Sequence, residues 1–320
     1  MKNRNFVSFF AGAGLLLTAM IWGFAFIVVK NSLDIVPPML LLAFRFTIAA
    51  VLIGVIGAKQ LRKINKKAIF AGGLVGVFLF FAYAFQTFGC LYTTAGKNAF
   101  LTSVYVIVVP FLNWAINKQL PRKKIIIAAF AAIVGIGFIT LDGSSSLGIN
   151  IGDMLTLICG VFLAAQMVAV SRYISSVSPF IFTFIQLVFA SVLSWVAALF
   201  LGERFTITAF YDISVVFSMI YLGVFSTMLC FFLQNLCQKY IPAAASSILL
   251  STEAVFGCLF SFLFNNEQIS LKMAIGCCIM FFSVLLVEID FKPRKKVINY
   301  LEKSYKLFRK NMNYTRDKDF

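Results

Sequence analysis

The stretch Phe6–Val29, FVSFFAGAGLLLTAMIWGFAFIVV, runs for 24 residues without a charged side chain. An α-helix needs about 20 apolar residues to cross the hydrocarbon core of a bilayer. A strand of a membrane barrel would instead alternate polar and apolar residues over about ten positions. The stretch therefore predicts a membrane-spanning helix. Its length also favours an uncleaved first helix over a signal peptide, although Lys2 and Arg4 precede it.

Similar apolar runs recur along the chain, which is 61% hydrophobic and only 12% charged. Soluble domains carry about 25% charged residues. The sequence therefore predicts an all-α integral membrane protein, with Pro110 kinking the fourth span. The ten spans that we expect are 8–29, 38–58, 68–90, 97–117, 123–141, 152–173, 180–201, 211–236, 243–264 and 272–290.

The net charge of +16 would suggest nucleic-acid binding in a soluble protein, but here the basic residues lie between the apolar runs and in the tail. Lys and Arg concentrate in cytoplasmic loops of membrane proteins. With the N-terminus inside, the loops 59–67 and 118–124 and the tail are strongly basic. The outside segments hold only Lys30, Lys97, Arg204 and Lys272. We therefore expect a multi-pass protein of the plasma or inner membrane, with both termini cytoplasmic and no nucleic-acid partner.

The two halves of the sequence match when one is shifted against the other. A shift of 148 aligns Gln86 with Gln234 and Ser103 with Ser251, and a shift of 141 aligns Pro38 with Pro179. Because each half has five spans, the second copy would enter the membrane upside down. Inverted repeats of this kind typically surround a central site in transporters.

The residue content argues against catalysis and cofactors. Histidine is absent, and none of the seven cysteines forms a C-x-x-C pair. The chain also has no Gly-rich phosphate-binding loop of the ATPase type. We therefore expect no enzyme activity, no cofactor and no metal site.

Several motifs resemble the drug/metabolite transporter superfamily, and within it the EamA-type members. In the first half these are Trp22-Gly23-Phe24, Pro37-Pro38 with Arg45, and Thr94 to Ser103; in the second half they are Pro242 to Ser246 and Ser251 to Gly257. The resemblance covers roughly residues 10–290. The chain departs from the family pattern at Glu253-Ala254, where many relatives have Glu-Pro, and at Asn265-Asn266-Glu267, where many have Gly-Glu.

The resemblance implies ten helices in two inverted five-helix repeats around a central cavity. The repeats would be EamA-like units over 1–141 and 142–290, followed by a basic cytoplasmic tail over 291–320. It also implies export or exchange of a small-molecule substrate, without naming that substrate.

Two charged side chains fall deep inside predicted spans, away from the span ends. Arg45 either snorkels to the interface, bonds a backbone carbonyl, faces the cavity as an anion-attracting cation, or pairs with Glu253. Glu253 lies near the middle of the ninth span, where desolvation favours the neutral carboxyl. It is either a protonated structural group or a proton-coupling site.

The candidate cavity residues are polar or amphipathic side chains inside the spans. For the amides, bonding between helices is the alternative role. Lys97, at the outer start of the fourth span, is either an ordinary loop lysine or a cation at the cavity mouth. The full candidate set is Trp22, Arg45, Tyr83, Gln86, Asn98, Tyr105, Gln166, Gln186, Gln234 and Glu253.

The tail repeats apolar residues every three or four positions from Val297 to Met312. It is either an interfacial helix on anionic lipid or a disordered basic tail.

For the whole chain, the preferred function is a secondary transporter of small metabolites, such as amino acids or related polar or amphipathic solutes, or drugs. The alternatives are a membrane enzyme that acts on lipid-linked substrates and a non-transporting sensor or assembly subunit.

Overall fold

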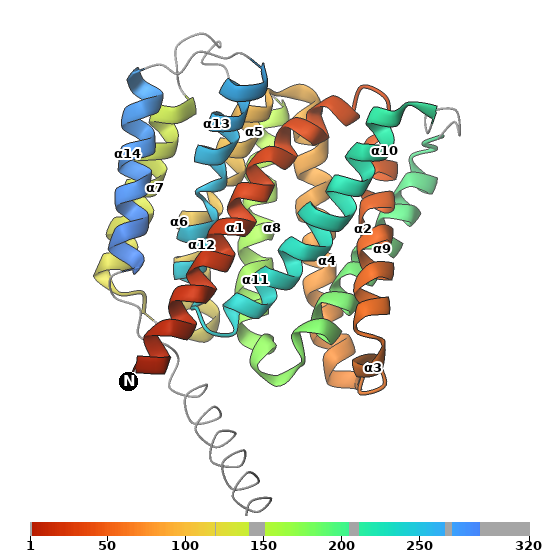
Figure 1. The fold of residues 1–320 in the computed structure, drawn as a ribbon, viewed down its shortest axis with the longest axis horizontal. Helices are drawn as coiled ribbons and strands as arrows, with labels where there is room; N and C mark the ends of the chain where they lie inside the picture. Colours follow the sequence, from red (N-terminus) through yellow and green to blue (C-terminus); the bar gives the residue numbers. More distant parts are fainter. Residues whose placement is uncertain (1, 119, 141–150, 205–210, 266–270, 289–320) are drawn as a thin grey trace, which may run out of the picture.

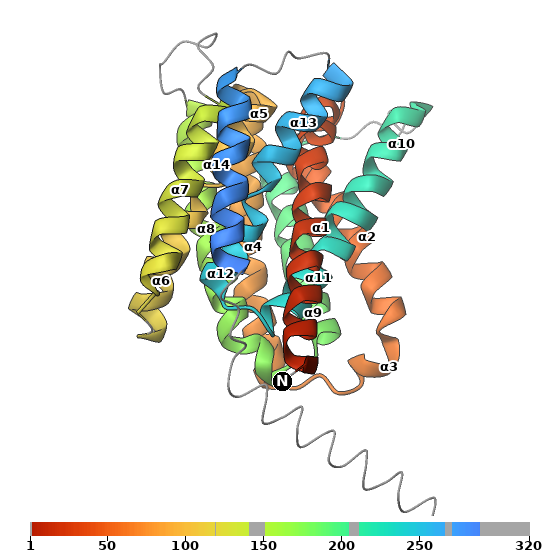
Figure 2. The same ribbon diagram turned by 60° about the vertical axis from the view of Figure 1, so that its left-hand side comes forward.

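A computed structural model of the chain describes residues 2–118, 120–140, 151–204, 211–265 and 271–288. The tail and its predicted lipid contact lie outside the described residues. Within those residues the structure is helical and contains no strand. The helices run up and down through one bundle, with α7 and α14 side by side at one edge (Figures 1 and 2).

The first half contains α1 (Lys2–Ser32), α2 (Pro38–Ile56), the short α3 (Ala58–Leu61), α4 (Lys66–Tyr92), α5 (Ala95–Thr102), α6 (Tyr105–Asn117) and α7 (Lys123–Thr140). The second half contains α8 (Ile151–Tyr173), the 3-10 turn η1 (Ile174–Ser176), α9 (Pro179–Phe200), α10 (Ile213–Ile220), the π-helix η3 (Tyr221–Leu229), α11 (Cys230–Gln238), α12 (Ala243–Leu250), α13 (Glu253–Asn265) and α14 (Leu271–Glu288).

Eight helical segments of the described residues are long and apolar enough to cross a membrane. They correspond to the first four predicted spans of the first half and the first four of the second. The fifth and tenth predicted spans correspond to α7 and α14, each 18 residues long. The count of ten membrane-crossing helices remains a prediction.

Two predicted spans are broken near their middles. The fourth divides into α5 and α6 at Ser103–Val104, and the ninth divides into α12 and α13 at Ser251–Thr252. At both breaks a serine hydroxyl donates to a carbonyl of the preceding turn: Ser103 to Ala99 and Ser251 to Ile248. Such side-chain bonds compete with the helix ladder. Pro110, where the kink was expected, lies inside α6.

Close helix contacts depend on glycine. A Cβ atom on Gly76 of α4 would lie 2.6 Å from the carbonyl oxygen of Gln186 in α9. A Cβ on Gly23 of α1 would lie 2.8 Å from the backbone nitrogen of Gly257 in α13. Small residues let helix backbones approach in this way inside membranes. These contacts hold α1 and α4 close to the second half of the chain.

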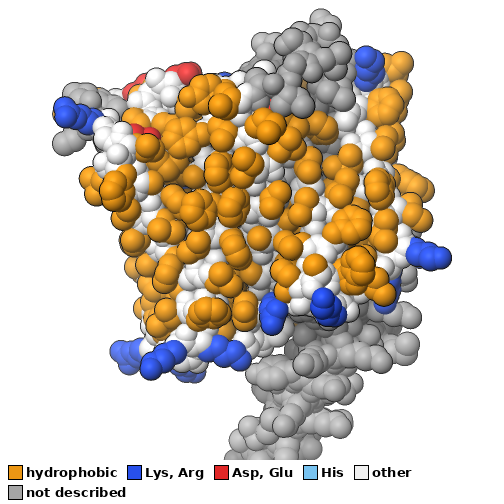
Figure 3. All heavy atoms as spheres, turned by 180° about the vertical axis from the view of Figure 1, so that it is seen from behind, with side chains coloured by type: hydrophobic (Ala, Val, Ile, Leu, Met, Phe, Trp, Pro, Cys, Tyr) orange, Lys and Arg blue, Asp and Glu red, His pale blue; other side chains and the backbone are white. Residues whose placement is uncertain are grey.

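The sides of the bundle are covered by hydrophobic side chains (Figure 3). Phe70, Leu199 and Phe200 are among the large apolar residues that are mostly exposed. Lys and Arg side chains gather mainly at the lower rim in this view, which is the end where α1 begins. We call this the N-terminal end of the bundle. An apolar belt with a basic rim is the surface of a protein embedded in a bilayer.

Candidate functional site

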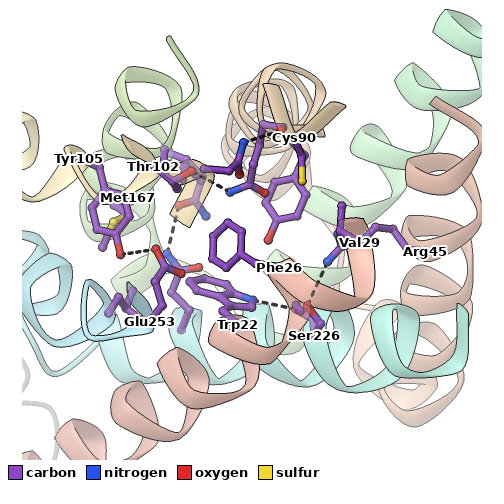
Figure 4. A pocket seen from close by; sticks show the side chains of 18 residues that line it. Trp22, Phe26, Val29, Arg45, Cys90, Thr102, Tyr105, Met167, Ser226 and Glu253 are labelled. Atoms are coloured by element: carbon purple, nitrogen blue, oxygen red, sulfur yellow. Dashed lines mark hydrogen bonds between the residues drawn. The ribbon is translucent and has the colours of Figure 1, made fainter. Parts of the chain in front are cut away.

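A buried cavity lies between the two halves of the bundle, and side chains from α1, α2, α4, α5, α6, α8, η3, α11, α12 and α13 line it (Figure 4). The centre of a water molecule can reach a volume of about 40 Å³ inside it. The cavity is therefore narrow in this conformation.

Arg45 of α2 borders one side of the cavity, and its guanidinium is held by the π-helix η3. Nε donates to Thr227 Oγ1 at 2.9 Å, and Nη2 donates to Ser226 Oγ at 3.1 Å. The guanidinium carbon also lies 4.8 Å from the ring centre of Tyr83, which is a cation–π distance. The side chain is only 2% exposed, so snorkelling to the interface is wrong.

The π-helix is also bonded to α1. Trp22 Nε1 donates to the carbonyl oxygen of Ser226 at 2.8 Å, and the Tyr221 hydroxyl donates to the carbonyl of Ile21 at 2.7 Å. π-helices are rare in proteins and frequently lie at functional sites. Here η3 offers two hydroxyls and a carbonyl on the side that meets Arg45 and Trp22.

Glu253 occupies the opposite side of the cavity from Arg45, with Trp22 and Phe26 between them (Figure 4). Its Oε1 accepts from the Tyr105 hydroxyl at 3.1 Å and from the Ser103 hydroxyl at 3.4 Å. The expected alternative of an Arg45–Glu253 ion pair is therefore not what the structure shows. Glu253 is also the first residue of α13, and the positive end of a helix dipole favours a negative charge there.

Amide side chains form the rest of the polar lining. Gln86 donates to Thr102 Oγ1 at 3.3 Å, and Gln234 donates to Gln166 Oε1 at 3.1 Å. Asn98 donates both to the Gln86 carbonyl and to Thr156 Oγ1. The lining thus combines donors, acceptors and aromatic faces, which suits a solute that is polar at one end and apolar at the other.

Nine of the ten candidate residues surround this one cavity: Trp22, Arg45, Tyr83, Gln86, Asn98, Tyr105, Gln166, Gln234 and Glu253. Their role in binding a substrate remains a prediction. Gln186 does not line the cavity. It lies in α9 on the flank of the bundle, where its Oε1 accepts from Asn235 Nδ2 at 3.0 Å. Lys97 lies in α5, and its side chain is outside the described part of the structure.

Sequence reasoning missed several lining residues, including Phe26, Cys90 and Ser226. Phe26 follows Trp22 by one helical turn, and Cys90 follows Gln86 by the same interval. A search at i+4 from the chosen residues would therefore have found both. Ser226 carries no such signal, because its role depends on the π-helix.

The described residues contain no cluster of three or more Cys, Asp or Glu side chains that could hold a metal ion. Among the described residues that line the cavity, the only carboxyl is that of Glu253 and the only cation is Arg45. These two groups and the amides are suited to binding a solute by hydrogen bonds and charge.

Comparisons with known proteins agree on the class of protein. The sequence profile of the EamA-like transporter family matches residues 10–141 and 150–289. An uncharacterized transporter from Archaeoglobus fulgidus is 32% identical over 280 residues, covering 88% of this chain and 86% of that protein. The uncharacterized transporter YoaV from Bacillus subtilis is 23% identical, covering 88% of this chain and 98% of that protein.

A solved crystal structure has the same fold, with a TM-score of 0.70 at 16% sequence identity. The match covers 86% of this chain and 95% of the chain in that crystal structure. The family, the apolar helices and the relatives together identify a multi-pass membrane protein with a role in transport. The chain belongs to the EamA-like transporter family.

Proposed function

We propose that the protein is a secondary transporter that exports small polar or amphipathic metabolites through the buried cavity by alternating access. The substrates would be amino acids, related solutes or drugs. The observation that carries this proposal is the convergence of both sequence halves on one polar cavity inside an apolar bundle. Placing polar groups inside a membrane costs free energy, so the polar groups found there usually serve a function.

The cavity is built from equivalent positions of the two halves. Gln86 and Gln234, which align at the 148-residue shift, both line it. The breaks at Ser103–Val104 and Ser251–Thr252 align at the same shift. These matches support two inverted five-helix repeats over 1–141 and 142–290. In alternating access, passage of a metabolite would require the two halves to move around this cavity.

The basic rim supports a cytoplasmic location for the N-terminal end of the bundle. The loop between α3 and α4, which contains Lys63, would then face the cytoplasm, and the basic tail would contact anionic lipid of the inner leaflet. Labelling of a Lys63→Cys thiol by a membrane-impermeant maleimide tests this orientation. The thiol should be labelled only in inside-out vesicles. Labelling in intact cells would show that the orientation is the reverse of the one proposed.

The alternative of an enzyme acting on lipid-linked substrates would need its polar residues grouped at one membrane face. Instead, Arg45 and Glu253 are 2% and 3% exposed in the interior of the bundle. The geometry therefore favours transport.

A flux assay tests the proposal. Proteoliposomes loaded with a mixture of the twenty amino acids and small amphipathic amines would be followed by mass spectrometry of the released solutes. We expect faster release of at least one solute class than from protein-free liposomes. Gln86→Leu should abolish the excess release, whereas Phe200→Leu on the lipid-facing surface should preserve it. No excess release of any solute would contradict transport.

A further inference from the structure

The internal repeat pairs most of the cavity lining residue by residue. At the 148-residue shift, Gln86 pairs with Gln234 and Tyr105 pairs with Glu253, and all four line the cavity. At the 141-residue shift, residues 22, 25 and 26 of α1 pair with residues 163, 166 and 167 of α8, and all six again line it. The centre of the cavity therefore follows the symmetry of the repeat.

Six lining residues break this symmetry. Three of them, Arg45, Tyr83 and Ser226, contact one another around the Arg45 guanidinium. The other three lie together at one end of the bundle. Val29, Cys90 and Asn98 lie at the ends of α1, α4 and α5 that are remote from the N-terminal end of the bundle, and all three line the cavity. Their repeat partners are Val170, Gln238 and Ser246. These partners lie at the opposite ends of α8, α11 and α12, do not line the cavity, and are fully buried. The cavity therefore extends toward one end of the bundle only.

Two of the buried partners carry polar atoms that lack hydrogen bonds. Both amide atoms of Gln238 and the hydroxyl of Ser246 are buried without a partner in the described structure. A buried polar group without a partner is destabilising, so native proteins rarely keep one without a reason. Gln238 and Ser246 come from different helices, and the repeat places both at the same end of the bundle.

We propose that Val170, Gln238 and Ser246 line a second vestibule at the N-terminal end, which is closed in this structure and opens to the cytoplasm in the alternate state. The proposal rests on the alternating-access function. In that state the second half adopts the arrangement that the first half has here. The Gln238 amide and the Ser246 hydroxyl then border the cavity, as Asn98 does at the other end here. Water and the passing polar solute can then bond their unpaired atoms.

The same symmetry supplies a control position. Cys237 neighbours Gln238 in sequence, and its repeat partner is Gly89. In this structure Gly89 packs tightly on α8, where an added Cβ would clash with the Thr156 hydroxyl oxygen. Cys237 packs similarly on α1, with its sulfur 2.8 Å from a Cβ added to Gly14. Cys237 should therefore stay packed in both states.

Thiol labelling tests the vestibule without any knowledge of the substrate. Four single-cysteine proteins are needed, in a background with the other cysteines replaced by alanine: native Cys90, native Cys237, Gln238→Cys and Ser246→Cys. A membrane-impermeant maleimide is applied to intact cells and to inside-out vesicles. A site exposed in a state populated at about 1–10% reacts at about that fraction of the rate of a free thiol.

We expect Gln238→Cys and Ser246→Cys to react at least about tenfold faster than Cys237, and only in inside-out vesicles. Cys90 should react only in intact cells. If the topology is reversed, each site should react in the other preparation instead. The vestibule proposal would still be supported. The proposal fails if both new thiols react no faster than Cys237, or if they react from the same face as Cys90.

Two variants on separate helices protect the test against misfolding of one of them. Transport is read separately by the flux assay on the same single-cysteine proteins. If the two new thiols and Cys90 are labelled from opposite faces but the protein releases no solute, transport is refuted and the vestibule proposal stands. Solute release with no labelling of either new thiol would refute the vestibule and keep transport.

Discussion

The hydroxyl of Tyr105 donates a 3.1 Å hydrogen bond to Oε1 of Glu253, and the two residues occupy equivalent positions of the sequence repeat, 148 residues apart. Each is the first residue after a break in its span: α6 begins at Tyr105 and α13 begins at Glu253. The bond therefore joins the two halves of the protein at their matching breaks, inside the cavity. Any relative motion of the halves must strain or replace it.

Tyr105→Phe should destabilise the protein, because Glu253 then keeps only the longer bond from Ser103 inside the bundle. Loss of one partner of a buried carboxyl costs about 1–3 kcal/mol. The thermal unfolding midpoint of the detergent-purified variant should fall accordingly. Tyr211→Phe is the matched control, because Tyr211 is 83% exposed. Equal midpoints for the two variants would show that the Tyr105–Glu253 bond contributes nothing.

Arg45→Lys should weaken the attachment of α2 to the π-helix although the charge is kept. A guanidinium donates along several fixed directions, whereas an ammonium is a compact point charge that cannot reproduce the fork. Arg45 uses Nε for Thr227 and Nη2 for Ser226, and it lies over the Tyr83 ring. We expect a loss of about 1–3 kcal/mol. Arg172→Lys, on exposed surface near the end of α8, should change little in the same unfolding assay.

Gly76→Ala should disrupt the contact between α4 and α9. The added methyl group would lie 2.6 Å from the Gln186 carbonyl oxygen and 2.7 Å from Phe189 Cβ, so the helices must separate. Overpacking of this kind costs about 1–3 kcal/mol. Gly96→Ala adds the same methyl where nothing lies within 4 Å, and it should be neutral or slightly stabilising. Yields of folded protein from size-exclusion chromatography would show the contrast, and equal yields would count against it.

The sequence was sufficient to predict the long spans, because a run of about 20 consecutive apolar residues rarely forms anything but a membrane-spanning helix. Nine of the ten residues chosen for their polarity surround the cavity, because a polar side chain inside an apolar span must find polar surroundings. The same reasoning failed for Gln186, whose Oε1 is bonded by Asn235 outside the cavity. Polarity within a span predicts polar surroundings but not on which side of the helix they lie.

The breaks and the π-helix were not predicted, for a different reason. Ser103 and Ser251 are ordinary helix residues in most contexts, and their side-chain bonds to the preceding turn depend on the packing around them. Pro110 is the stronger local signal, yet it lies within α6. The π-helix η3 has no proline, and its bonds to Arg45 and Trp22 come from distant parts of the chain. Local sequence does not encode such contacts.

Lys30→Met should loosen the end of the cavity that is remote from the N-terminal end. Lys30 Nζ donates to the carbonyls of Cys90 at 2.7 Å and Thr93 at 3.0 Å, which ties α1 to the end of α4. If these bonds contribute about 1–2 kcal/mol, their loss should raise the labelling rate of native Cys90 by about five- to thirtyfold. Lys63→Met, in the exposed loop at the other end, should leave that rate unchanged. An unchanged rate in Lys30→Met would show that Lys30 does not restrict access.

Glu253→Gln tests whether the cavity carboxyl couples transport to protons. Glu253 is 3% exposed and accepts hydrogen bonds from Tyr105 and Ser103, so its charged form depends on these donors and on water in the cavity. Opening the cavity to either side changes that hydration, and with it the balance between the protonated and ionised carboxyl. Glutamine keeps the shape and an acceptor oxygen but cannot release a proton.

If coupling runs through Glu253, the Glu253→Gln protein should still exchange solute across proteoliposome membranes with no pH gradient. It should lose the accumulation that an imposed pH gradient drives in the wild-type protein. Gln166→Glu is an informative companion, because it places a second carboxyl in the same cavity beside Gln234. An unchanged pH dependence in Glu253→Gln would make Glu253 a structural group. Facilitated diffusion or solute exchange would then be the mechanism, with the Tyr105–Glu253 bond serving only to hold the two halves together.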